Sequence, residues 1–301
     1  MPELETVLAR IAAGETIVAD GAMGSLLMAK GLRPGMCPES MNLSRPELLE
    51  DIARQYREAG ADIVQTNTFG GSSLKLRGFR LEDRMEEINR NAVVAARKGA
   101  TEGVYLSASC GPTGRLLKPY GDTDPEEIYE SFRNQLEVVV EAGVDIICVE
   151  TMIDLREAVL AVKAARSIAP SIPLIATMTF EATARGFFTV MGNRVEDAVR
   201  DLSEAGADIL GSNCGNGSET MIRVAATFRS QTVLPLIIQA NAGIPSMVGG
   251  EPVYPETPEF MAEKSLDLVR EGVSIVGGCC GTTPAHIRSI AGVLKERRQG
   301  T

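Results

Sequence analysis

Three cysteines of this chain are placed where they could meet one soft metal ion. Cys279 and Cys280 are adjacent in the stretch Gly277-Gly278-Cys279-Cys280-Gly281-Thr282-Thr283-Pro284, which follows a short apolar run. Adjacent cysteines make a poor disulfide, because a bridge needs its two Cβ atoms to face across a gap. The flanking glycines would allow the backbone to bend so that both sulfurs face one cation. Cys214 ends another apolar run and can supply a third sulfur.

These residues predict a three-thiolate zinc site, with Cys214, Cys279 and Cys280 as metal ligands and catalytic residues. Zinc with three protein ligands and one exchangeable position is the catalytic pattern, whereas four protein ligands form a structural site. Three thiolates give the site a net charge of about −1, so zinc there would be a weak Lewis acid toward water. It would instead bind a substrate thiol as thiolate at neutral pH. The predicted reaction is attack of a substrate sulfur on an activated methyl or alkyl group.

The composition argues against several other classes of protein. The 301 residues suffice for one large domain or two small ones, and the net charge of −10 argues against binding to nucleic acid or to an anionic membrane. No apolar run has the length of a membrane span, and the acidic start is unlike a signal peptide, which predicts a cytoplasmic protein. Six cysteines in this setting do not predict a disulfide framework. His286 is the single histidine, so a zinc site must be rich in thiolates.

Eight short apolar runs recur along the chain, each followed by a loop rich in Gly, Asn or Thr and then by an amphipathic helix. Several follow the same helix ending, as in Glu58-Ala59-Gly60 and Glu204-Ala205-Gly206, which predicts a glycine C-cap before a buried parallel strand. Eight strand–helix units of about 35 residues predict a (β/α)8 TIM barrel, a single domain over residues 1–301, in preference to an open doubly wound sheet. The runs are Thr16–Ala19, Asp62–Gln65, Val104–Ala108, Asp145–Val149, Pro173–Met178, Asp208–Gly211, Pro235–Ala240 and Val273–Val276.

The chemistry of such a barrel lies at the C-terminal ends of its strands, and the unusual polar residues of this chain fall there. Strands six and eight are separated by one strand in a closed barrel, so the three cysteines can converge. The strand-end residues are Asp20-Gly21, Thr66-Asn67-Thr68-Phe69-Gly70, Cys110-Gly111-Pro112-Thr113-Gly114, Glu150-Thr151, Thr177 and Thr179, Asn213-Cys214, Asn241-Ala242-Gly243 and Cys279-Cys280.

These motifs, with Asp20-Gly21-Ala22-Met23-Gly24 at the first strand, resemble the homocysteine S-methyltransferase family over about residues Ile17 to Leu294. The strongest resemblance is to the homocysteine-binding barrel of cobalamin-dependent methionine synthase. It implies a zinc-bearing enzyme that methylates homocysteine to methionine, with Cys214, Cys279 and Cys280 on the metal.

The resemblance also implies a substrate site. Asp20 and Glu150 would hold the substrate amino group, and backbone amides around Gly21-Ala22 and Thr68 would hold its carboxylate. Asn241 would lie near the metal and could occupy the fourth position when substrate is absent.

The methyl donor implied by the methionine-synthase likeness is a methylcorrinoid carried by a separate protein. S-methylmethionine and betaine are alternatives. Betaine is disfavoured because aromatic side chains, which cradle quaternary ammonium groups, make up only 4% of the chain. Two further alternatives stay open: a corrinoid-linked demethylating methyltransferase with another substrate, and a non-catalytic zinc- or thiol-binding subunit of a methyl-transfer complex.

Three departures from the family pattern are expected to border the substrate pocket: the stretch 186–192, Ala240, and Ser109-Cys110. Of the remaining cysteines, Cys148 is expected in the core, Cys110 as a small strand-end residue or a fourth ligand, and Cys37 in a loop. His286 is expected to be a capping or surface residue. Asp62, Asp145 and Asp208 are expected to begin strands on the non-catalytic face.

Overall fold

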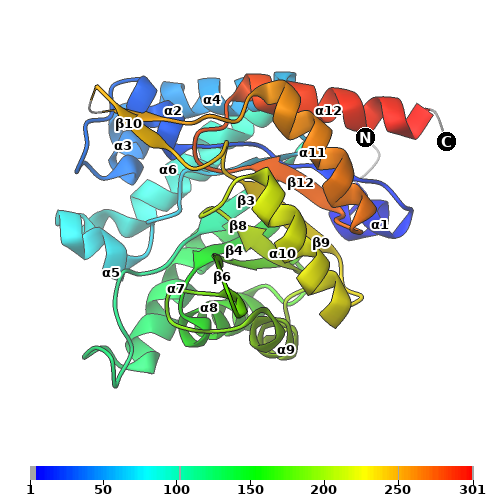
Figure 1. Cartoon of the computed structure of the whole chain (residues 1–301). Coiled ribbons are helices and arrows are strands. Elements are labelled where there is room, and N and C mark those ends of the chain that lie inside the picture. Colours follow the sequence, from blue (N-terminus) through cyan, green and yellow to red (C-terminus); the bar gives the residue numbers. More distant parts are fainter. Residues whose placement is uncertain (1–4, 102, 250, 300–301) are drawn as a thin grey trace.

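The computed structural model describes residues 5–101, 103–249 and 251–299, which form the expected (β/α)8 barrel (Figure 1). Eight parallel strands run in the order β1-β12-β9-β8-β5-β4-β3-β2. The parallel bridge from Ala19 to Ile63 joins the two ends of this sheet. The barrel strands are β1 (Ile17–Val18), β2 (Ile63–Gln65), β3 (Tyr105–Cys110), β4 (Ile146–Met152), β5 (Leu174–Met178), β8 (Ile209–Asn213), β9 (Leu236–Ala240) and β12 (Ile275–Gly278). Each overlaps one of the eight predicted apolar runs.

Helices cover the outside of the barrel, and one long helix follows each strand. These eight are α4 (Pro46–Glu58), α6 (Met85–Ala100), α7 (Pro125–Glu141), α8 (Leu155–Ile168), α9 (Val195–Ala205), α10 (Ser218–Gln231), α11 (Pro258–Arg270) and α12 (Pro284–Gln299). Shorter helices are α1 (Val7–Ala12), α2 (Gly24–Ala29), α3 (Met41–Ser44) and α5 (Ser73–Leu76), with 3-10 turns at Pro38–Ser40, Arg77–Phe79 and Glu82–Arg84. No helix in the described ranges is long and apolar enough to cross a membrane.

Two short antiparallel hairpins, which the sequence did not predict, lie in the loops after β5 and β9. They pair β6 (Glu181–Thr183) with β7 (Gly186–Phe188) and β10 (Ser246–Val248) with β11 (Glu251–Val253). Their strands are three residues long and largely exposed, so they lack the buried apolar run by which the barrel strands are recognised.

The core has two parts, inside the barrel and between the barrel and its helices. The inner cluster consists mainly of isoleucines, one from most of the strands, together with Val7 of α1. Isoleucine suits this place because its branched side chain fills the tapering interior. Helix α1 therefore packs against the N-terminal end of the barrel. The inner cluster comprises Val7, Ile17, Ala19, Ile63, Tyr105, Ile146, Cys148, Ile175, Ile209, Ile237 and Ile275.

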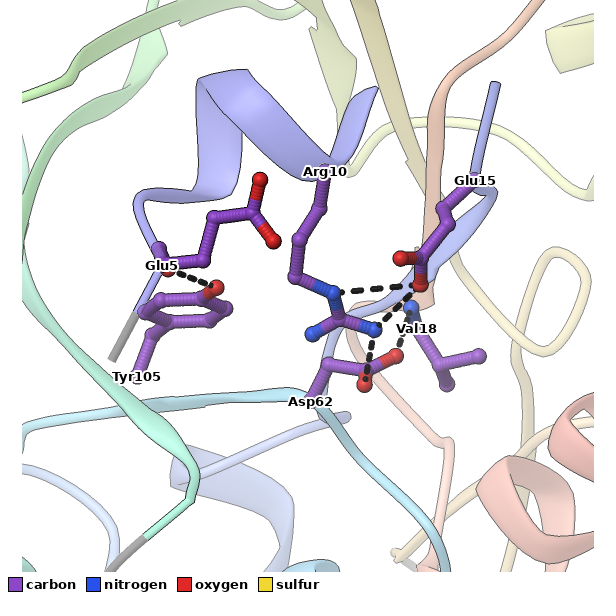
Figure 2. A network of polar contacts seen from close by, with 6 residues as sticks. All are labelled: Glu5, Arg10, Glu15, Val18, Asp62 and Tyr105. Atoms are coloured by element: carbon purple, nitrogen blue, oxygen red, sulfur yellow. Dashed lines mark hydrogen bonds and ion pairs between the residues drawn. The ribbon is translucent and has the colours of Figure 1, made fainter. Parts of the chain in front are cut away.

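An aspartate–arginine ion pair joins α1 to the N-terminal end of the barrel (Figure 2). Asp62, just before β2, accepts a hydrogen bond from the Val18 N–H at 2.9 Å and one from Arg10 Nη2 at 3.0 Å. Arg10 also donates to Glu15 and lies over the Tyr105 ring, 5.8 Å from its centroid. The carboxylate therefore joins two strands and the helix that covers them.

The same arrangement recurs twice around the barrel. Asp145 accepts from the Leu106 N–H and from Arg97, both at 2.7 Å. Asp208 accepts from the Leu174 N–H at 2.8 Å and from Arg166. The expectation that these aspartates begin strands on the non-catalytic face is therefore confirmed.

A fourth position around the barrel has the arginine of this arrangement but a serine in place of the aspartate. Ser274 stands before β12 as the aspartates stand before their strands, and its N–H donates to the Leu236 carbonyl at 2.9 Å, as Asp208 donates to Leu174. Arg229 contacts the Gly272 carbonyl at 3.1 Å, as Arg166 contacts Gly206. Its buried Nε has no hydrogen-bond partner among the described residues, and burial lowers the pKa of this guanidinium.

We therefore expect Ser274→Asp to stabilise the protein by about 1 kcal/mol, because the new carboxylate would give the Arg229 guanidinium the charge-assisted acceptor that the other three arginines have. Urea unfolding at neutral pH measures the gain. The control is Ser274→Asn, which adds similar volume without charge and should recover little of it. A lower urea midpoint for Ser274→Asp than for the unaltered chain would contradict this account.

Candidate metal centre and substrate cavity

The three cysteines predicted to bind metal lie at the C-terminal ends of β8 and β12, on either side of β9. The Cys214 N–H donates to the Gln239 carbonyl at 3.1 Å, and the Cys279 N–H donates to the Ala240 carbonyl at 2.7 Å. Both cysteine loops are therefore hydrogen bonded to the strand between them. The backbone of Cys214 is left-handed, with φ of 62°, which turns its side chain out of the strand pattern.

The glycines around the cysteine pair are required by close approach as well as by backbone bending. Gly281 has φ of 81°, and a Cβ there would lie 2.1 Å from the Tyr254 ring. A Cβ on Gly278 would lie 2.4 Å from Oγ1 of Thr282. That hydroxyl donates to the Cys279 carbonyl at 2.7 Å, so the tight contact fixes the turn that presents both sulfurs.

The sulfur atoms are spaced as zinc ligands are. All three lie within 4.8 Å of one another, and the Cys214 and Cys280 sulfurs are 3.8 Å apart. Two ligands at the usual Zn–S length of about 2.3 Å in a tetrahedron are about 3.8 Å apart. A disulfide would need about 2.0 Å, so these are free thiols. Among the described residues no other group of cysteine, histidine or acidic side chains forms such a cluster.

Hydrogen bonds among the three thiols favour ionisation of one of them over the other two. Hydrogen bonds from Cys279 and Cys280 lower the pKa of Cys214 to about 3. Hydrogen bonding to Cys214 raises the pKa of Cys280 to about 11 and raises that of Cys279 as well. Only a cation among the three sulfurs would allow all of them to ionise together.

Asn241 supplies a second observation that fits a metal. Its Oδ1 is buried and has no hydrogen-bond partner among the described residues, although a buried amide oxygen normally has one. Its side chain also contributes to lowering the pKa of Cys214, which places it beside that sulfur. The three thiols are a donor set that fits zinc, and Asn241 lies beside one of them.

A cavity of about 300 Å³ opens in front of the sulfurs. Its walls come from the C-terminal ends of β3 and β4, within those strands, and from the ends of β1, β2, β8, β9 and β12 with the loops that follow them. The lining residues are Gly21, Ala22, Met23, Gly24, Ser25, Met28, Pro38, Glu39, Gln65, Thr66, Asn67, Phe69, Ser109, Glu150, Thr151, Cys214, Gln239, Tyr254, Gly278, Cys279 and Cys280.

Two buried carboxyl groups lie at this site, and burial makes both weak acids. Burial raises the pKa of Glu150 to about 7, although hydrogen bonds from Ser109 and Gln65 oppose the rise. Burial, reinforced by the nearby Glu150, raises the pKa of Asp20 to about 8. Glu150 lines the cavity, whereas Asp20 is not among the lining residues; its Oδ2 accepts from the Gln65 N–H and its buried Oδ1 has no partner among the described residues. A bound ammonium group would favour the ionised forms of both.

This burial predicts a pH-dependent stability. The folded-state pKa of Asp20 is above its ordinary 3.8, so its contribution to stability is complete below about pH 4 and is lost as pH rises through about 8. We expect Asp20→Asn, with zinc removed by chelator, to flatten the decline in unfolding free energy between pH 5 and 9 by a few kcal/mol (about 1.4 kcal/mol per pKa unit). Urea unfolding at several pH values measures this. Parallel curves for variant and unaltered protein would contradict it.

Two of the backbone N–H groups expected to bind a substrate carboxylate already donate hydrogen bonds within the protein. The Ala22 N–H donates to Thr282 Oγ1 at 3.0 Å, and the Thr68 N–H donates to the Thr66 carbonyl at 3.0 Å. In the same loop the N–H groups of Asn67 and Phe69 have no partner among the described residues, and both residues line the cavity. In this loop the N–H groups that are free to bind a substrate carboxylate are therefore those of Asn67 and Phe69, and not that of Thr68.

Sequence reasoning missed the role of Asn213, which adjoins Cys214. Its Oδ1 accepts from the Thr151 N–H at 2.9 Å and from Thr177 Oγ1 at 2.8 Å. Its Nδ2 donates to Glu150 Oε2 at 3.1 Å and to Thr151 Oγ1 at 2.7 Å. One fully buried amide thus joins the ends of β4, β5 and β8. The motif Asn213-Cys214 was the signal, but the sequence does not reveal these partners.

The other expected residues are placed as follows. Cys148 lies in the barrel interior, as expected of a core residue, and Cys110 is buried with its sulfur 3.6 Å from Gln135 Oε1. Cys37 is buried, 3.1 Å from Glu39 Oε2, a partner that the sequence did not reveal. His286 is a capping residue, because its Nδ1 accepts from the Thr283 N–H at 3.2 Å.

The expectation that all three departures border the pocket is wrong for two of them. Ser109 lines the cavity, but Ala240 and the segment 186–192 are not among its lining residues. Ala240 belongs to the cluster between barrel and helices because Gln239, its neighbour in the strand, takes the inward position. Phe187 turns toward α10, where Arg223 lies 5.4 Å from its ring centroid.

Fold and site together define a single-domain (β/α)8 barrel with a candidate thiolate metal centre beside a cavity at the C-terminal end of the barrel. The chain belongs to the homocysteine S-methyltransferase family, a class of methyltransferase, since the model of that family matches residues 17–294. The expected family resemblance is thereby confirmed.

Individual relatives agree with this assignment. The chain is 34% identical over 307 residues to methionine synthase of Mycobacterium tuberculosis and 32% identical over 318 residues to that of Mycobacterium leprae, covering 96% and 99% of this chain. It spans only about a quarter of the length of these relatives, 25% and 26%. The metallated form of the homocysteine methyltransferase MmuM from Escherichia coli has a similar fold, with a TM-score of 0.78 and 21% identity over 94% of this chain and 98% of that one.

Proposed function

We propose that this protein is a zinc-dependent methyltransferase that methylates the thiol of L-homocysteine to give methionine. The observation that carries the proposal is the set of three sulfurs at zinc-ligand spacing, facing a cavity that also exposes Glu150. When bound by Cys214, Cys279 and Cys280, zinc would supply a positive centre that keeps a substrate thiol ionised at neutral pH.

The chain's own residues would orient the substrate. Glu150 faces the cavity and, with Asp20 beside it, can hold a cationic amino group. Gly21, Ala22, Asn67 and Phe69 line the cavity, and the N–H groups of Asn67 and Phe69, which have no partner among the described residues, can receive a carboxylate. This pattern of one thiolate site, one ammonium site and one carboxylate site fits a small amino acid that carries a thiol.

The reaction balances without an added oxidant or reductant. The substrate thiol loses its proton, and its sulfur lone pair forms the new bond to the methyl carbon. The bond between that carbon and the donor breaks, and its electron pair stays with the donor. The protein therefore has to exclude water and align the sulfur with the donor, which a cavity at the barrel mouth can do.

We propose a methylcorrinoid on another protein or module as donor, and the methionine synthases among the relatives support this choice. A betaine donor is less well supported. Phe69 and Tyr254 are the only aromatic side chains among the described residues that line the cavity, and an aromatic cage for a quaternary ammonium needs more. S-methylmethionine is the alternative small donor.

The test is methyl transfer to homocysteine by zinc-loaded protein, with methylcobalamin and S-methylmethionine supplied in parallel and methionine as the product measured. Methionine from methylcobalamin supports the whole proposal. Methionine from S-methylmethionine alone keeps the thiol methylation and overturns the donor. No methionine from either, with one zinc bound per chain, overturns homocysteine as the acceptor and favours the non-catalytic or demethylating alternatives.

A further inference from the structure

Glu256, which lies outside the cavity, connects the loops that carry the cysteines. It directly precedes Thr257, the N-cap of α11. Its carboxylate accepts from the Ser218 N–H, 3.1 Å from each oxygen, and from Ser218 Oγ at 2.6 Å. Ser218 is the first residue of α10 and stands four positions after Cys214. The loop after β9 is thus fastened to the Cys214 loop.

Helix α10 depends on this contact because it has no cap of its own. Its N-cap residue is Gly217, which has no side chain to accept from the first N–H groups. Glu256 supplies that acceptor from 38 residues away, and a carboxylate is favoured at the positive end of a helix. A Cβ on Gly217 would lie 2.2 Å from Glu256 Oε1, so glycine is required there for the carboxylate to reach the helix.

The backbone of Glu256 extends the connection to the other two cysteines. Its carbonyl accepts from His286 Nε2 at 3.1 Å, and the same imidazole accepts from the Thr283 N–H through Nδ1. Its N–H donates to the Ala242 carbonyl at 2.9 Å, and the Ala242 N–H donates to the Cys280 carbonyl at 3.0 Å. Both routes lead to the turn that holds Cys279 and Cys280.

We propose that Glu256 is a positioning residue of the three-thiolate centre, which sets the separation between Cys214 and the Cys279–Cys280 pair without touching metal or substrate. Those sulfurs belong to different strands, and between them lies only β9 with its loop. Mutation of a residue that orients metal ligands without binding the metal typically weakens metal affinity by about 10–100-fold. This inference rests on the proposed metal site.

The experiment compares the zinc dissociation constants of full-length Glu256→Gln and the unaltered protein, by competition with a chromogenic chelator. Glutamine keeps the size and one acceptor oxygen but loses the charge, so we expect zinc binding about 10–100-fold weaker. Ser218→Ala removes the 2.6 Å contact from the other side and should weaken binding in the same direction. It serves as the second variant if Glu256→Gln does not fold. The matched control, Glu263→Gln, removes an exposed carboxylate of α11 and should bind zinc normally.

A second readout separates positioning from general stability. Cobalt(II) replaces zinc and gives a thiolate-to-metal charge-transfer band that reports ligand geometry. We expect this band to shift or weaken in Glu256→Gln at a temperature where apo and loaded proteins are folded. A lowered melting temperature with normal zinc affinity and a normal cobalt spectrum would overturn the positioning role. If the unaltered protein itself binds no zinc, the proposed metal site fails first and this inference fails with it.

Discussion

Replacing Cys214 by serine is expected to lower zinc affinity by at least about a thousandfold and to abolish methyl transfer. A serine hydroxyl stays protonated at neutral pH and is a poor ligand for a borderline-soft cation. The remaining cysteines would leave the ion with two thiolates. Serine is close to cysteine in size and Cys214 is only partly buried, so the fold should survive. Zinc content per chain and methionine formation are the measurements.

Cys110→Ser is the matched control for that substitution. Cys110 is buried near the same end of the barrel, but its sulfur faces Gln135 and is not part of the cluster. This variant should keep one zinc per chain, because Cys110 lies outside the cluster. Its local structure should also be kept, because a serine hydroxyl can donate to Gln135 as the thiol does. Full zinc in Cys214→Ser would place the metal elsewhere. Equal loss of zinc from Cys110→Ser would make Cys110 a ligand, which is the alternative that the sequence left open.

The second large effect is expected from Asn213→Asp, a change of one amide nitrogen to oxygen. The Nδ2 of Asn213 now donates to Glu150 at 3.1 Å and to Thr151 at 2.7 Å. An aspartate oxygen there would face the Glu150 carboxylate, and two carboxylates so close cannot both ionise. We expect a loss of about 2–4 kcal/mol in unfolding free energy at pH 8, together with a steep rise in KM for homocysteine.

The pH dependence identifies the cause. The new carboxylate pair would take up a proton on folding, so its folded-state pKa is raised. Its contribution to stability is then present at low pH and is lost as pH rises. The difference between Asn213→Asp and the unaltered protein should therefore shrink from pH 8 to pH 5 in urea unfolding. Asn213→Ser, which adds no charge, should show a constant difference, and a constant difference for Asn213→Asp would contradict the repulsion.

The barrel could be predicted because its signals are local. Each strand is a short apolar run after a glycine turn, and the aspartates that begin strands lie within those same segments. The cysteines could be grouped because the C-terminal ends of parallel strands meet at one end of a barrel. Neither inference needed a contact between particular side chains.

What the sequence could not reveal depends on such contacts. Glu256 caps α10 from 38 residues away, and Asn213 donates a hydrogen bond to Glu150 across 63 positions. No local sequence pattern therefore marks either contact. The strands of the two hairpins are short and largely exposed, and one hairpin carries the segment 186–192 away from the cavity. The likeness in sequence at a strand end indicates which loop a residue belongs to, but not which way that loop turns.

The recurring aspartate–arginine pairs divide the barrel into four strand–helix–strand–helix units, of which the last has Ser274 in the acidic position. This periodicity at the N-terminal end is what gene duplication of a quarter-barrel would leave behind. The opposite end carries the cysteines and the buried acids, and its two hairpins follow β5 and β9, the first strands of the third and fourth units. The contacts that join strands in pairs therefore lie at one end of the barrel, and the candidate site lies at the other. Grafting loops from one relative to another should therefore alter substrate preference while the scaffold is inherited intact.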